Sequence, residues 1–146
     1  MNDSYDSPWK DALHDFLQPF LAFFFPTIEA EIDWSMEVEF LETELRKSER
    51  DAEVGLRTVD VLARVQLLQG QQTFLWIHVE VQSQRDEDFQ ERMLVCHYRL
   101  RDRVGGPVLS LGILGDDSPN WRPSRYLWEF LGCRLEFRFP VVKLLD

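Results

Sequence analysis

The chain has 146 residues, of which 45% are hydrophobic and 29% charged, a mixture typical of a globular domain rather than of a disordered segment. Two cysteines provide neither a disulfide framework nor a CxxC metal spacing, which favours a reducing compartment. The most apolar run, residues 20–25, is far shorter than the roughly 18–20 residues of a membrane span, and the acidic start lacks the basic region of a signal peptide. The sequence therefore predicts a single cytoplasmic domain over residues 1–146, with no membrane partner.

The formal net charge of −10 is unevenly distributed along the chain. Residues 1–56 hold 14 acidic and 4 basic side chains, whereas residues 57–146 hold 12 of each. Balanced charge is not a basic patch, so electrostatics alone does not favour binding to nucleic acid. The acidic first part would also suit a contact with another protein.

The first predicted element is a helix that begins at Ser7-Pro8, a capping residue followed by a proline in the first turn. Its predicted apolar stripe consists of Trp9, Leu13, Phe16, Leu17 and Phe20. Pro19 is expected to kink this helix and Pro26 to end it, because proline lacks the backbone N–H of a helical residue. The acidic residues 27–56 predict only a strand or a short helix.

Two segments in the middle of the chain, 57–66 and 72–82, alternate between two sets of residues, which predicts two β-strands. The faces with the β-branched residues are Val59, Val61, Ala63 and Val65 in the first segment and Leu75, Ile77, Val79 and Val81 in the second. Residues 68–71 supply the turn, so the two strands are expected to form an antiparallel hairpin.

Three further elements follow the hairpin. Residues 86–88 are acidic and open a helix that ends at Gly105-Gly106-Pro107. The predicted apolar stripe of this helix is Phe89, Met93, Cys96, Leu100 and Val104. The apolar run 108–114 predicts a central strand, and the alternation over 135–139 predicts a last strand. The order of elements predicts an α/β (α+β) fold, with a mixed sheet and a central hairpin flanked by helices.

Two carboxylates are expected to meet on the hairpin. If its turn is centred on Gly70, Asp60 lies opposite Glu80, and directly opposed Cβ atoms are about 4.5–5.5 Å apart. Gln82 lies on the same face. Two such charges repel one another, and partial burial increases that cost. A Mg²⁺ ion would relieve the repulsion, and the backbone carbonyl of Val81 could supply another oxygen ligand.

A simpler arrangement would leave the two acids as ordinary surface ions. A bulge, or a shift of the register by one residue, would separate them or turn them to opposite faces. Asp60 could then pair with Arg64, and Glu80 with Arg85.

The sequence around these acids resembles the PD-(D/E)XK nuclease superfamily, and more closely its branch of recombination-promoting nucleases and transposase-like proteins. The resemblance is carried by Val59-Asp60-Val61-Leu62 and by residues 77–84, Ile-His-Val-Glu-Val-Gln-Ser-Gln. In that pattern Asp60 and Glu80 match the metal-binding acids, and Gln82 matches the third catalytic position. The resemblance also covers residues 6–10, 89–93, 98–100, 121–123 and 139–146.

The resemblance implies a restriction-endonuclease-like core and a metal-dependent DNA endonuclease associated with recombination or mobile elements. Mg²⁺ or Mn²⁺ would be held by Asp60, Glu80 and the Val81 carbonyl, and would activate a water that attacks the phosphodiester. The partner would be DNA. Related nucleases often act as dimers, so a homodimer is compatible with the resemblance, although no segment identifies an interface. Members of this family usually continue further, which is compatible with a missing C-terminal part.

One departure from the pattern concerns positive charge, since Gln82 stands where many members have lysine. A neutral amide can orient a water but cannot neutralise developing charge. Lys10 is a candidate substitute, although a solvated lysine is the simpler interpretation. Arg92 and Arg99, with Arg103, lie on one line of the second helix and could hold phosphate, or form an ordinary ion-paired face with Asp88 and Glu91.

Other polar and aromatic residues are expected to be structural. His78 lies on the face of Glu80 and could act as a base or ligand, but a half-buried strand histidine is the simpler interpretation. No zinc site is predicted, because His14 and His97 do not cluster with either cysteine. Trp121 and Trp128 have arginine neighbours and could stack on bases, although packing is the more frequent role of such residues.

Three hypotheses about function therefore follow from the sequence. The first is the metal-dependent endonuclease. The second is a catalytically inactive binding or assembly module with the nuclease fold, which the Gln82 departure and the charge of −10 would suit. The third is an acidic protein–protein partner built on residues 1–56.

Overall fold

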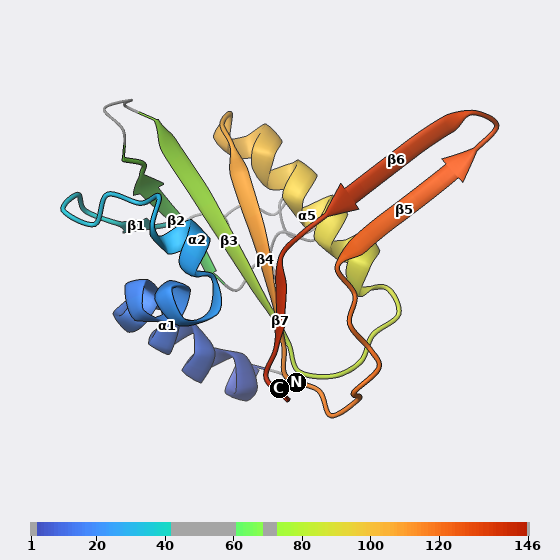
Figure 1. Ribbon diagram of the computed structural model, residues 1–146, viewed down its shortest axis with the longest axis horizontal. Coiled ribbons are helices and arrows are strands. Elements are labelled where there is room, and N and C mark those ends of the chain that lie inside the picture. Colours follow the sequence, from blue (N-terminus) through green and yellow to red (C-terminus); the bar gives the residue numbers. More distant parts are fainter. Residues whose placement is uncertain (1–2, 42–60, 69–72, 146) are drawn as a thin grey trace.

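The computed structural model describes residues 3–41, 61–68 and 73–145, which form a mixed α/β structure. Its elements are α1 (Asp3–Phe24), α2 (Pro26–Glu29), β1 (Glu39–Phe40), β2 (Val61–Gln66), β3 (Phe74–Gln82), α5 (Phe89–Val104), β4 (Val108–Leu114), β5 (Arg125–Phe130), β6 (Cys133–Arg138) and β7 (Val141–Lys143). A five-stranded mixed sheet in the order β1-β2-β3-β4-β7 lies between α1 and α5, and β5–β6 form a separate hairpin (Figure 1). None of the helices in the described ranges is long and apolar enough to cross a membrane.

The central hairpin has the predicted register. β2 and β3 pair antiparallel from Gln66↔Phe74 to Val61↔Val79, as expected for a turn centred on Gly70. Asp60 and the earlier part of the predicted strand lie outside the described residues. β4 runs parallel to β3 after the α5 crossover, and β7 is parallel to β4 at the sheet edge.

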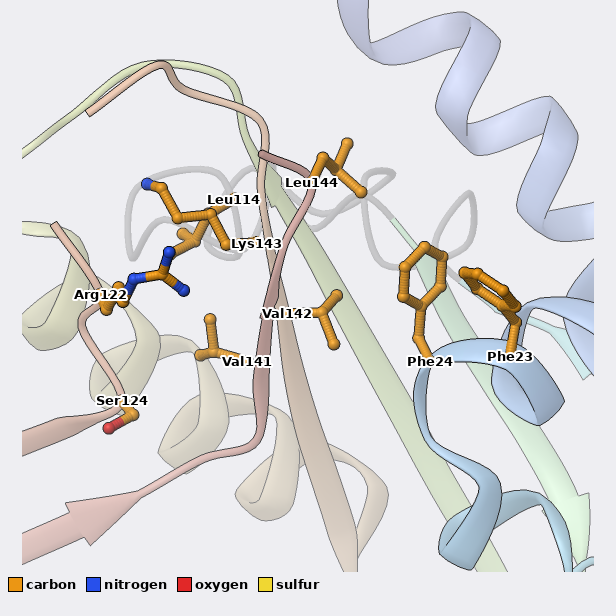
Figure 2. Close-up of a pocket in the computed structure, with 9 residues that line it drawn as sticks. All are labelled: Phe23, Phe24, Leu114, Arg122, Ser124, Val141, Val142, Lys143 and Leu144. Carbon is orange, nitrogen blue, oxygen red and sulfur yellow. The ribbon is translucent and has the colours of Figure 1, made fainter. Parts of the chain in front are cut away.

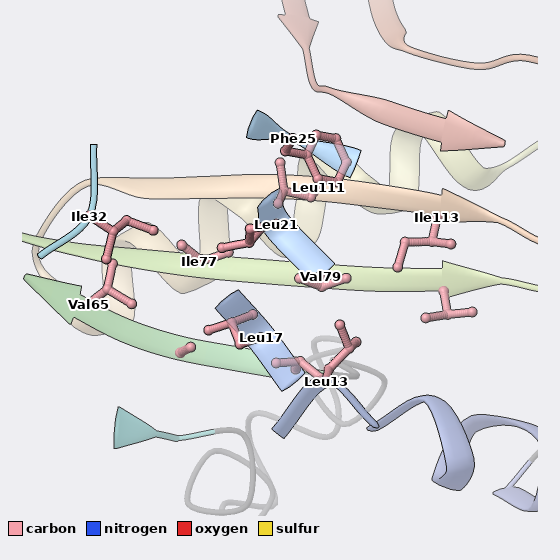
Figure 3. Packing of buried hydrophobic residues seen from close by; sticks show 13 residues of the cluster. Leu13, Leu17, Leu21, Phe25, Ile32, Val65, Ile77, Val79, Leu111 and Ile113 are labelled. Carbon is pink, nitrogen blue, oxygen red and sulfur yellow. The ribbon is translucent and has the colours of Figure 1, made fainter. Parts of the chain in front are cut away.

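Alternation along the strands separates two apolar layers. Val61, Ala63 and Val65 of β2 share a face, as do Ile77 and Val79 of β3, as predicted, and these residues pack against α1 (Figure 3). The other face of the sheet packs on α5. Leu62 contacts Cys96 and Leu100 there, whereas Phe89 and Met93 pack with Leu114, Trp121 and Phe139. The predicted stripe of α5 is therefore confirmed, and Gly105 ends the helix in the left-handed conformation with φ 69°.

The first helix, α1, is kinked at Phe16, three residues before Pro19. Phe16 has non-helical dihedrals (φ −131°, ψ 36°), because the proline ring crowds the carbonyl of the preceding turn. Leu13, Leu17 and Leu21 are buried, whereas Phe16 is 61% exposed. Its assignment to the buried stripe is therefore wrong, since the kink interrupts the helical period on which that assignment depended.

The C-terminal strands also differ from the sequence prediction. The strand predicted over 135–139 is present as β6, which starts two residues earlier and ends at Arg138, and after Pro140 the chain joins the main sheet as a further strand, β7, that was not predicted. The aromatic segment 125–130 is a full strand, β5, which pairs with β6 through a turn at Leu131-Gly132. Both turn residues have positive φ, 49° and 88°, the backbone geometry of a tight two-residue hairpin turn.

Candidate active site

Three polar side chains of β3 point to the α5 face, opposite the α1 core. His78, Glu80 and Gln82 alternate with the buried Val79 and Val81, and they run toward the carboxyl end of the strand. His78 is fully buried and Glu80 nearly so, whereas Gln82 is half-buried. A polar row thus leads from the interior of the sheet to its end, beside the start of α5.

A chain of hydrogen bonds fixes the inner part of this row. His78 Nε2 lies 3.0 Å from Glu80 Oε1, and His78 Nδ1 lies 2.9 Å from Ser110 Oγ on β4. His97 Nδ1 of α5 also lies 2.9 Å from Ser110 Oγ. With both imidazoles neutral, one proton assignment satisfies all three contacts: His97 donates to Ser110, Ser110 donates to His78, and His78 donates to Glu80.

Burial favours the neutral form of the outer histidine. Desolvation lowers the pKa of His97, and the nearby His78 and Arg101 lower it further. A neutral His97 agrees with the proton assignment above. The hydrogen-bond chain therefore holds the Glu80 carboxylate from the interior of the sheet. His78 is a buried structural histidine rather than the half-buried one expected.

The outer part of the row carries a cation. Arg92 on the first turn of α5 donates to Gln82 Oε1 at 2.5 Å and to Asp86 Oδ2 at 2.7 Å. Gln82 Nε2 donates to the carbonyl of Gln84 at 2.7 Å. The hydrogen bond from Arg92, with one from the Asp88 backbone, lowers the pKa of Asp86, so Asp86 is ionised at neutral pH. Gln82 and Arg92 are thus held as a pair at the end of β3.

Arg85, Arg64 and Arg92 each have an acidic partner other than the one expected from the sequence. Arg85 pairs with Glu87 at 2.9 Å rather than with Glu80. Arg64 pairs with Glu39 of β1, and Asp60, its expected partner, lies outside the described residues. Arg92 pairs with Asp86 instead of Asp88, although its backbone N–H does bond the Asp88 carbonyl.

Two predicted cations, Lys10 and Arg99, are not brought to Glu80 and Gln82 within the described ranges, and Val81 lies between these two residues on β3. The Val81 side chain packs on the α1 side, and only its backbone was assigned a role. Lys10 is half-buried on α1, which covers the opposite face of the sheet. Arg99 is half-buried and Arg103 exposed on α5. Of the predicted cations, the structure brings only Arg92 to this row.

A group with metal-binding atoms does exist beside Glu80. Donor atoms of His78, Glu80 and Cys96 lie within 4.8 Å of one another. Sequence reasoning considered His78 as a possible ligand beside Glu80 but missed Cys96 as their neighbour, although strand alternation and the α5 stripe direct His78 and Cys96 to the same layer. Both ring nitrogens of His78 are in hydrogen bonds, and Cys96 packs against Leu62 and Leu100. The carboxylate of Glu80 is therefore the donor most suited to a hard cation.

A buried ion pair at the ends of β4 and β7 was also missed. Lys143 Nζ donates to Asp116 Oδ1 at 2.6 Å and to the Trp121 carbonyl at 2.9 Å, and its side chain is only 1% exposed. Burial would raise the pKa of Asp116, but the hydrogen bonds from Lys143 and the Ser118 backbone outweigh it and lower the pKa. Trp121 is buried in the same cluster, which excludes the stacking of its ring on bases.

A groove of about 650 Å³ borders this ion pair (Figure 2). Arg122, Ser124 and Lys143 lie on one side of edge strand β7, and Phe23 and Phe24 on the other. The lining includes none of Glu80, Gln82 and Arg92, and its buried cation is already paired with Asp116. The groove is therefore separate from the polar row of β3.

Comparison of the chain with protein-family models, with curated proteins and with solved structures yields no match in any of the three sets. A functional assignment therefore depends on the residues of the polar row, their geometry and the resemblance of the sequence motif.

Proposed function

We propose that this protein is a metal-dependent DNA endonuclease with a restriction-endonuclease-like core. The sequence motif around Glu80 and Gln82 supports this proposal. The hairpin register supports it as well, since the predicted alignment that would pair Asp60 with Glu80 holds for each described pair of β2 and β3. The mixed sheet, with its central hairpin between helices, is compatible with the expected core.

The contact between Arg92 and Gln82 is the observation that carries the proposal. A lysine at the third motif position would place a cation at the end of β3, and Gln82 lacks that charge. Arg92 NH2 lies 2.5 Å from Gln82 Oε1, so a permanent cation from α5 stands beside this position. The guanidinium has five N–H donors and uses two contacts here, on Gln82 and Asp86. Its remaining donors suit the oxygens of a phosphate.

The donor set also fits a hard divalent cation. Glu80 provides a carboxylate held by His78, and oxygen ligands of this kind are those that Mg²⁺ prefers. Asp60 and the Val81 carbonyl are the other proposed ligands. When bound, Mg²⁺ or Mn²⁺ would polarise the phosphodiester and lower the pKa of a coordinated water.

Gln82, Arg92 and the residues behind Glu80 would have separate roles in the reaction. Gln82 would orient the attacking water through its amide, and Arg92 would bind the phosphate and offset its charge. The hydrogen-bond chain from His97 through Ser110 and His78 would keep the Glu80 carboxylate in one orientation, as outer-shell partners do at metal sites.

A second candidate is an inactive nuclease-fold module that binds or assembles without cleavage. It is favoured by the existing contacts of the Gln82 amide, which accepts from Arg92 and donates to the Gln84 carbonyl. Asp86 also neutralises part of the charge of Arg92. In this case the polar row would be a structural network that anchors α5 to β3.

Relaxation of supercoiled plasmid in Mg²⁺, Mn²⁺ or EDTA tests the two candidates. We expect metal-dependent nicking that Glu80→Gln reduces at least about 100-fold, the usual loss when a group that stabilises transition-state charge is removed. Gln keeps an oxygen that can accept from His78, so folding should persist. Glu91→Gln, which changes an exposed acid on α5, is the matched control. Equal cleavage by Glu80→Gln would refute the site, and DNA binding in EDTA without cleavage in either metal would establish the inactive module.

A further inference from the structure

The β5–β6 hairpin has one charged face and one apolar face. Its register places Tyr126 opposite Phe137, Trp128 opposite Leu135 and Phe130 opposite Cys133, and paired residues share a face. The other face carries the charged residues of the hairpin together with Leu127. Those charged residues are Arg125, Glu129, Arg134, Glu136 and Arg138.

Only the base of the apolar face is covered by the rest of the described chain. Phe137 packs on His97 of α5, with ring centroids 4.7 Å apart, and on Phe139 at 5.4 Å. Beyond this base the hairpin extends away from the main sheet (Figure 1). Trp128 is 45% exposed, Phe130 62% and Leu135 43%. A two-stranded hairpin is marginal in water without a covering layer, so burial of this face by a partner would stabilise it.

The charged face does not favour nucleic acid as that partner. Glu136 pairs with Arg125, Arg134 and Arg138, and Arg134 also pairs with Glu129 at 3.5 Å. Trp128, the exposed aromatic considered for base stacking, is on the opposite face from these arginines. A phosphate backbone would therefore meet paired arginines on one side and an uncharged surface on the other.

We propose that the apolar face of the β5–β6 hairpin is the interface of a homodimer, with the same face of a second copy as its occupant. An uncharged apolar patch is complementary to itself, which is what a two-fold interface requires. Tyr126, Trp128, Phe130 and Leu135 of this face, with Leu131 of the adjoining turn, would each bury on the order of 100 Å². The total, about 1,000 Å² over both copies, reaches the lower limit for a specific interface.

Two leucines of the hairpin provide a matched pair of variants. Leu135 lies on the apolar face and is 43% exposed, whereas Leu127 lies on the charged face and is 41% exposed. We expect sedimentation equilibrium from roughly 1 to 100 µM to give twice the monomer mass of 17.4 kDa for the natural chain and for Leu127→Lys. Leu135→Lys should raise the protein concentration at which half of the chains are dimeric by at least about tenfold. Far-UV circular dichroism checks that both variants remain folded.

Three outcomes would overturn the dimer. The first is a natural chain that stays monomeric over the whole range. The second is an equal effect of Leu127→Lys and Leu135→Lys, which would show that the apolar face is not the contact. The third is dissociation by added salt, because an apolar contact between two copies of charge −10 should hold or tighten when their repulsion is screened.

Cys133 supplies an independent measurement because it is exposed on the apolar face, whereas Cys96 is buried. A short bismaleimide should cross-link the natural chain and Leu127→Lys into a dimer, and should cross-link Leu135→Lys much less. Cys133→Ser should remove the product. Absence of a cross-linked dimer in the natural chain at concentrations where sedimentation detects one would exclude this face. None of these readouts depends on nuclease activity.

Discussion

Removal of Asp116 should destabilise the protein strongly, because it leaves a buried ammonium group without its counter-ion. Lys143 would keep one hydrogen-bond acceptor in the described structure, the Trp121 carbonyl at 2.9 Å, and the Ser118 N–H would lose its acceptor at 2.9 Å. Breaking a buried pair from one side costs about 3–5 kcal/mol. For a domain of this size the same loss corresponds to a fall in Tm of roughly 6–20 °C. Asp116→Ala is therefore expected to lower the free energy of unfolding by about 3–5 kcal/mol.

Urea denaturation followed by tryptophan fluorescence measures this loss, with two comparisons. Glu87→Ala removes the acid of the exposed Arg85–Glu87 pair and should cost less than about 1 kcal/mol. The double variant Asp116→Ala with Lys143→Met should be more stable than Asp116→Ala alone, because it removes the unpaired charge. A loss below about 1 kcal/mol for Asp116→Ala, or a double variant less stable than the single one, would refute the reasoning.

The same pair sets a pH dependence with a defined sign. The folded pKa of Asp116 lies below its ordinary value of 3.8, so its ionised form is stabilised by folding. This contribution is fully present above pH 3.8 and is lost as the pH falls through the lower folded pKa. The stability difference between the natural chain and Asp116→Ala should therefore be constant near neutral pH and shrink in acid. A difference that grows as the pH falls would contradict the assignment.

Two further predictions concern the polar row of β3. Arg92→Gln should reduce plasmid cleavage about 100-fold, since it removes the cation beside Gln82, whereas Arg99→Gln should change the rate less than about threefold. Equal rates for the two variants would remove Arg92 from the site. Ser110→Ala should cost about 1–3 kcal/mol in urea denaturation, because two histidines lose their shared partner, while exposed Ser124→Ala should cost almost nothing. A Ser110→Ala variant as stable as the natural chain would disprove the hydrogen-bond chain.

Local patterns in the sequence determined the strand faces and the hairpin register. Alternation with a period of two separates Val61, Ala63 and Val65 from Leu62, and this separation follows from strand geometry alone. The α5 stripe likewise follows from helical spacing. Where the local period is interrupted, the prediction failed, as at Phe16 near the Pro19 kink.

Contacts between distant segments were decided only by the tertiary structure. Lys143 and Asp116 are 27 residues apart, and no periodic pattern relates them. Ser110 is 32 residues from His78 and meets it because the α5 crossover brings β4 beside β3. The sequence assigned Arg92 to phosphate binding, but its pairing with Gln82 depends on where α5 begins relative to the end of β3. Periodicity specifies which side chains share a face, whereas packing specifies which of them touch.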